Sequence, residues 1–180
     1  MSKAKDGLTF REKVQEIIGQ CAKDWIQLIG IVREEARRTI DGKRVKILDE
    51  VGKNTITNAS LAVVSWLLGN TGSQTAFTYL ANGSDNTAAA ASQTALQSEN
   101  TTNWSARAAA TVSRVTTTQT NDTLQLVKTW TFTWSITVQE VGIFNNPTTG
   151  VMLWRKVVSS KTFGDTDTYT LTYQIVLAGA

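Results

Sequence analysis

Histidine is missing from this 180-residue chain, and cysteine occurs once, at Cys21. Histidine is the commonest general base and metal ligand in proteins. Without it the chain cannot build a Ser-His-Asp or Cys-His catalytic set, and one cysteine cannot complete a structural zinc site. We therefore expect a non-enzymatic protein with no metal and no cofactor. A single cysteine also rules out a disulfide within the chain.

Long apolar runs are missing as well. No stretch approaches the roughly 18 apolar residues of a membrane-spanning helix, and residues 1–9 are mostly polar, unlike a signal peptide. The formal charge is only +3, from 18 basic and 15 acidic residues, and the two signs are interleaved. Nucleic-acid binders concentrate basic residues in a patch or stripe. We expect neither membrane nor nucleic-acid association.

The charges that are present gather in the N-terminal third. Residues 1–53 hold 12 basic and 9 acidic residues, whereas residues 54–180 hold 6 of each and are rich in threonine. Such a charged segment is typical of an exposed or partner-contacting part of a chain. We therefore predict a docking and oligomerisation segment over residues 1–51 and a separate β domain over residues 52–180.

Two elements are predicted within residues 1–51. Apolar residues three and four positions apart predict a helix over residues 10–29, although the part from Trp25 onward would also suit a strand. The helix either packs on its own domain or contacts neighbouring copies of the chain. Asp41-Gly42 favours a tight hairpin turn, because both positions need positive φ. The residues assigned to the candidate interface are Phe10, Val14, Ile17, Cys21, Trp25 and Leu28.

A short helix is predicted over residues 57–69. Thr57, Asn58 or Ser60 can cap its beginning, and Gly69-Asn70 supplies the stop. Its apolar stripe is expected to pack against the sheet through Leu61, Val64, Leu67 and Leu68.

Alternation of large apolar residues with threonine, serine and glutamine predicts strands in the C-terminal half. Residues 124–136 are interpreted as one long strand. Several such strands, joined by short polar turns, predict a mainly β fold: an antiparallel β-sandwich, Greek-key or jelly-roll-like, with an N-terminal helix and one short packed helix. The expected core contains Leu61, Leu67, Trp130, Phe132, Trp134, Ile143, Leu171 and Tyr173.

Glu140 is the one acidic residue that lies between apolar neighbours of a predicted strand. Leaving a buried carboxylate unpaired costs several kcal/mol, so it needs a cationic partner. Arg155 on the facing strand is our preferred partner, and Arg107 is the alternative. We interpret the pair as structural. A polymer-cleaving enzyme would need a second suitable carboxylate, and Asp165 and Asp167 are better explained as turn residues.

The order of several short motifs resembles a known family. Asn-x-Ile-Thr-Asn precedes the short helix, Ile-Thr-Val-x-Glu-Val-Gly-Ile-Phe-Asn occupies residues 136–145, and Gly-x-Met-Leu-x-Arg occupies residues 150–155. Together with residues 77–83, 94–99, Arg107 and 167–175, this order resembles small virion structural proteins of tailed bacteriophages. These are described as tail-fibre, baseplate or head-decoration components. The resemblance covers about residues 52–177.

The resemblance implies a non-enzymatic virion protein that is assembled in the host cytoplasm and attaches to other virion proteins. It also implies self-association into a homo-oligomer, a trimer being one option. We favour a tail, fibre or baseplate location, with capsid decoration as the alternative. A second alternative is a carbohydrate-binding module that uses an exposed Trp104 or Trp154.

Overall fold

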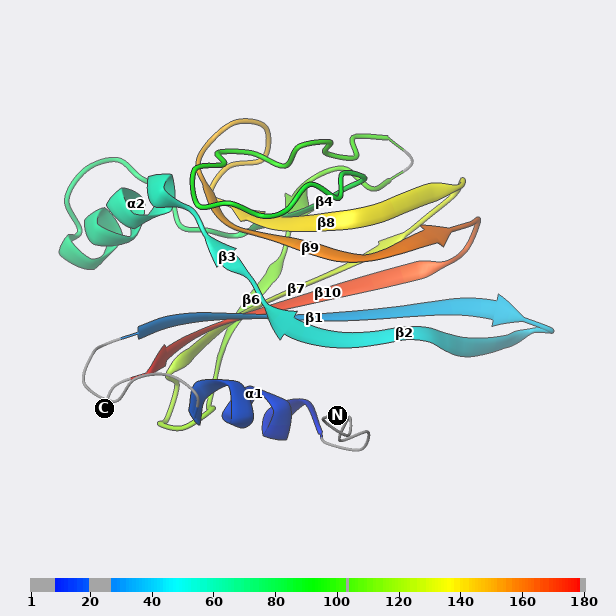
Figure 1. Ribbon diagram of the computed structural model, residues 1–180, viewed down its shortest axis with the longest axis horizontal. Helices are drawn as coiled ribbons and strands as arrows, with labels where there is room; N and C mark the ends of the chain where they lie inside the picture. The colour runs from blue at the N-terminus through cyan, green and yellow to red at the C-terminus, as the bar shows by residue number, and fades with distance from the viewer. Residues whose placement is uncertain (1–8, 20–26, 103, 179–180) are drawn as a thin grey trace.

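The structure is a computed structural model, and it describes residues 9–19, 27–102 and 104–178. Strands make up 51% of it and helices 12%, which confirms the predicted mainly β sandwich. Two five-stranded antiparallel sheets face each other, as Figure 1 shows. Sheet A has the order β2 (Lys43–Lys53), β1 (Gln27–Ile40), β10 (Thr168–Ala178), β7 (Thr123–Thr131) and β6 (Thr111–Val115). Sheet B has the order β3 (Thr55–Ile56), β9 (Met152–Phe163), β8 (Ile136–Phe144), β4 (Tyr79–Gly83) and β5 (Ala108–Ala109).

The β1–β2 hairpin is part of sheet A. Its turn is as predicted, because Asp41 and Gly42 both have positive φ, 49° and 72°. β1 then pairs with β10 from Gln27↔Ala178 to Arg37↔Thr168 and occupies the inside of the sheet. This corrects the expectation that residues 1–51 form a separate docking segment. The charges misled the prediction because Arg33, Glu35 and Arg37 lie on the outer face of β1 and others lie on edge strand β2, where charged side chains keep a sheet edge soluble.

The core lies between the two sheets and contains most of the residues expected there. Trp130, Phe132, Ile143, Leu171 and Tyr173 are all buried. Trp130 and Phe132 flank Thr131, and Leu171 and Tyr173 flank Thr172, which is the alternation of strands with one buried face. Ile143 differs, because β8 is buried on both faces along this part. The rings of Phe132 and Phe163 stack with their centroids 5.2 Å apart, which joins the end of β7 in sheet A to the end of β9 in sheet B.

Trp134 does not belong to this core, and the single long strand predicted over residues 124–136 is wrong. β7 ends at Thr131, and β8 begins in the other sheet at Ile136. The chain has to turn between the layers, and the turn leaves the Trp134 side chain 68% exposed. Alternation in the sequence continued through the turn and so concealed it.

Helix α2 (Asn58–Gly69) lies where the sequence predicted a short helix and stops at Asn70, which has φ 47°. It stands at one end of the sandwich (Figure 1). Ser60 and Val63 are its buried residues, whereas Leu61 and Leu67 are 51% and 40% exposed. The prediction of those two leucines as core is therefore wrong. The helix is turned so that its small residues face the sheet.

Helix α1 (Phe10–Gly19) lies against the outer face of sheet A (Figure 1). Phe10 packs there on Ile29, Ile31 and Val176, and the Arg33 guanidinium lies 5.4 Å from the centre of its ring. Val14 and Ile17 fall within α1, and Leu28 packs against the central core from β1. Phe10 and Leu28 thus contact their own chain, in line with the prediction that this segment packs on its own domain, but Leu28 does so from β1, so the predicted helix does not extend to residue 29. Cys21 and Trp25 lie outside the described residues.

Candidate interaction surface

Most of the motif segments, residues 77–83, 94–99, 136–145 and 150–155, lie in or over sheet B, whereas residues 167–175 belong to β10 of sheet A. The long segment between β4 and β5 lies over the outer face of sheet B (Figure 1), with Leu96, Phe144 and Met152 packed beneath it. Glu140 and Arg155 are both fully buried under the segment, and the Arg155 Nε lies 2.6 Å from a Glu140 carboxylate oxygen. The ion pair preferred from the sequence is therefore present.

Each end of this pair holds the covering segment in place. The Glu140 carboxylate accepts the backbone N–H groups of Gln97, at 3.0 Å, and Ser98, at 2.7 Å. The Arg155 guanidinium donates to the Thr87 carbonyl at 2.7 Å and to the Asp85 carboxylate at 3.3 Å. All these groups have partners in the fold, so the pair fastens the segment between β4 and β5 to sheet B.

Arg107, the alternative partner of Glu140, pairs with Glu99 instead, at 2.6 Å. It also donates to the carbonyls of Asn146 and Thr149, both at 3.1 Å, and its guanidinium lies 3.4 Å from the centre of the Phe144 ring. The side chain therefore joins the segment between β4 and β5 to the end of β8 and the turn that follows it. In the described residues, no group of three or more acidic or cysteine side chains could hold a metal ion.

One buried carboxylate went unnoticed in the sequence. Glu34 on β1 points into the interior and accepts hydrogen bonds from Tyr169, at 3.0 Å, and Lys156, at 3.3 Å. Burial raises the pKa of Glu34, and the Lys156 charge works against that rise. The only available signal was its place on a strand beside Ile31 and Val32. A charged run followed it, and this suggested solvent exposure.

The surface of α2 is the feature that the fold leaves unexplained. The helix carries no charged residue, and apolar side chains surround its axis. Besides Leu61 and Leu67, Trp66 is 44% exposed and Leu68 is 82% exposed. A helix that is apolar all round is normally buried. We define the α2 surface as Leu61, Trp66, Leu67 and Leu68.

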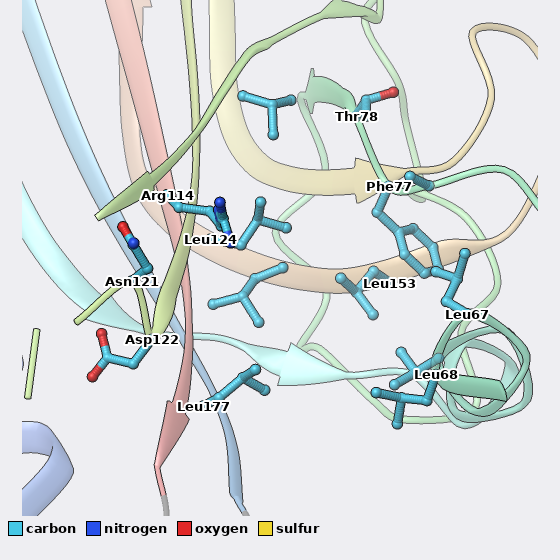
Figure 2. A pocket seen from close by; sticks show the side chains of 14 residues that line it. Leu67, Leu68, Phe77, Thr78, Arg114, Asn121, Asp122, Leu124, Leu153 and Leu177 are labelled. Carbon is cyan, nitrogen blue, oxygen red and sulfur yellow. The ribbon is translucent and has the colours of Figure 1, made fainter. Parts of the chain in front are cut away.

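An apolar groove of about 340 Å³ opens beside the α2 surface, between the ends of the two sheets. Figure 2 shows Leu67 and Leu68 on one side of it, Leu124 and Leu177 on the opposite strands, and Leu153 between them. The walls come from α2, β6, β7, β9 and β10, so no local sequence pattern could have predicted the groove. The sequence of α2 did carry a signal, because the helix has no polar face. We interpreted its apolar residues as a surface packed against the sheet.

Two charged side chains, Arg114 and Asp122, lie on the wall of the groove opposite α2. The Asp122 carboxylate accepts the backbone N–H groups of Thr117, Thr118 and Gln119, each at 2.8 Å. Partial burial works to raise the pKa of Asp122, but these hydrogen bonds outweigh it and hold the pKa well below its ordinary value. The rim therefore carries one positive and one negative charge at neutral pH.

The chain matches no protein-family model, no curated protein and no solved structure. In the parts of the chain that the structure describes, no helix is long and apolar enough to cross a membrane.

Proposed function

We propose that the chain is a non-enzymatic structural protein of a tailed-phage virion. In this proposal it associates with copies of itself and attaches to other virion proteins. The observation that carries the assembly role is the uncharged α2 surface, which stands exposed beside an open apolar groove. Large exposed apolar patches on soluble proteins mark interaction sites. The order of motifs over residues 52–177 supports the virion assignment, with the tail, fibre or baseplate preferred over the capsid.

The ion pairs on the outer face of sheet B support a structural role over a catalytic one. Glu140 and Arg155 of this sheet form one ion pair beneath the segment between β4 and β5, and Glu99 and Arg107 of that segment form another. A rigid, fully paired surface suits a particle component, because ordering at an interface then costs little extra entropy on assembly.

Electron microscopy of purified particles, labelled with gold-conjugated antibody against this chain, tests the proposal. We expect label on the tail. Label on the capsid would contradict the tail preference and support the decoration role. Particles without label, from a culture in which the chain is expressed, would contradict the virion assignment itself.

Carbohydrate binding is a second candidate, favoured by the exposure of Trp104. Trp154 is buried and cannot stack on a sugar, whereas Trp104 is 79% exposed and has φ 61°. The next residue, Ser105, is buried, and its carbonyl accepts a hydrogen bond from Asn82, so Trp104 stands on a fixed turn. Strained, exposed side chains on fixed turns are often functional.

An array of bacterial oligosaccharides tests this second candidate. The unmodified chain should bind at least one sugar, Trp104→Ala should lose that binding, and the control Trp134→Ala should keep it. Binding to no sugar on the array would exclude the candidate.

A further inference from the structure

The exposed apolar side chains of this protein are unevenly distributed. In the described parts of the chain, ten large apolar side chains are exposed, and six of them lie on α2 or on the groove. The six are Leu61, Trp66, Leu67, Leu68, Val112 and Leu177. A cluster of this kind is unfavourable in water and is stabilised when a partner covers it.

The shape of this cluster is complementary to itself. Leu68 is 82% exposed and stands on the rim of the groove, so a projection and a hollow lie side by side (Figure 2). In two copies related by a two-fold axis, the Leu68 side chain of each copy can enter the groove of the other. A two-fold interface uses the same patch on both copies, so one patch has to supply both shapes.

The charge distribution of the cluster also favours a second copy of the chain as the partner. Identical patches face each other across a two-fold axis, and any net charge on the patch would repel its copy. α2 has no charged residue, and the charges on the opposite wall, Arg114 and Asp122, have opposite signs. The patch is therefore electrically neutral, and opposite charges of the two copies can approach each other.

We propose that the α2 surface and the groove form the two-fold interface of a homodimer, in which each Leu68 occupies the groove of the other copy. The inference rests on the self-association proposed above, and it specifies the partner, the symmetry and the contact. It replaces the trimer considered from the sequence with a dimer.

Light scattering of the purified full chain tests this inference. The unmodified chain should have twice its chain mass of 19.6 kDa. Leu68→Glu and Leu177→Lys should each weaken the dimer by about 100-fold or more, since each places a charge in both apolar contacts. An equimolar mixture of the two variants should restore the dimer, because one contact then pairs opposite charges and the other is unmodified.

The matched control is Ile40→Glu, which changes an exposed apolar residue at the β1–β2 turn, away from α2. It should leave the dimer unchanged. A monomeric or trimeric unmodified chain, a dimer indifferent to Leu68→Glu, or a mixture that stays monomeric would overturn the inference. None of these results depends on the particle labelling, so the dimer can fail while the virion assignment stands, and the reverse also holds.

Discussion

At the scale of single residues, Glu140 and Arg155 show how a buried ion pair can be structural without being a strong source of stability. Removing both charges from water is costly, and their attraction roughly offsets that cost. Their main effect is to position the segment between β4 and β5 through Gln97, Ser98 and Thr87. Losing one partner should therefore be far more harmful than the modest net value of the pair suggests.

Arg155→Met is expected to lower the free energy of unfolding by about 3–5 kcal/mol, because it leaves the Glu140 carboxylate buried without its cation. Adding Glu140→Gln should recover at least about 1 kcal/mol, since the neutral amide still accepts a backbone N–H. Urea denaturation measures both. The exposed Lys53→Met is the control, with an expected change below about 0.5 kcal/mol. A double variant no more stable than Arg155→Met would contradict this account.

The two tryptophans at either side of the β7 end should behave oppositely. Trp130→Ala should cost about 3–5 kcal/mol, because the side chain is buried in the core. Trp134→Ala should cost less than about 1 kcal/mol, because the ring is 68% exposed in the turn. Thermal or urea unfolding of both variants measures these losses of unfolding free energy. Equal losses would mean that the Trp134 ring is packed in the core.

Asp122 is expected to make folding sensitive to acid. Its folded pKa lies below the ordinary value of 3.8, so its contribution is fully present above pH 3.8 and is lost as the pH falls toward the folded pKa. The unfolding free energy of Asp122→Asn should therefore change less between pH 5 and pH 2 than that of the unmodified chain. Equal changes in the two proteins over this pH range would contradict the account.

At the scale of elements, the β1–β2 hairpin decides where the domain begins. Removing residues 1–26 takes away the Phe10 contact and leaves both strands, so the truncated chain should fold with reduced stability. Removing residues 1–53 exposes the inner edge of β10 and should prevent folding. Circular dichroism with thermal unfolding distinguishes the two products. A folded chain that starts at Asn54 would restore the predicted boundary near residue 51.

Periodicity predicted the elements better than it predicted their surroundings. The alternation in residues 168–178 located β10 and its buried face, because period two follows directly from strand geometry. It could not predict what covers α2, because an apolar helix has the same sequence pattern whether its own sheet or another molecule packs on it. Glu140 was found because its neighbours were apolar. The groove was not, because its walls come from five elements that only the fold brings together.

At the scale of the whole molecule, sheet A pairs the first strand of the described chain, β1, with the last, β10. Gln27 and Ala178 are paired neighbours in the register of β1 and β10. Pairing strands over such a sequence separation has a high entropic cost of loop closure, and this cost slows the folding of β proteins. The centre of the sheet therefore forms only when most of the chain is already available.

A circular permutant tests this dependence. A short linker from Ala178 to Gln27, with new ends opened at Asp41-Gly42, turns the β1–β10 pairing into a local hairpin. We expect refolding to be at least several-fold faster than in the linear chain of residues 27–178, measured by stopped-flow fluorescence. An unchanged rate would mean that this pairing forms after the rate-limiting step.

β10 is the central strand of sheet A, and its Ile175 and Leu177 also line the groove beside α2. A polypeptide that stops before Thr168 lacks both the centre of sheet A and one wall of the proposed contact. Such a product therefore could neither fold as sheet A requires nor form the proposed dimer contact. Under the virion role proposed above, nonsense alleles upstream of β10 should be recessive in a mixed infection, because the truncated chain could not enter the particle.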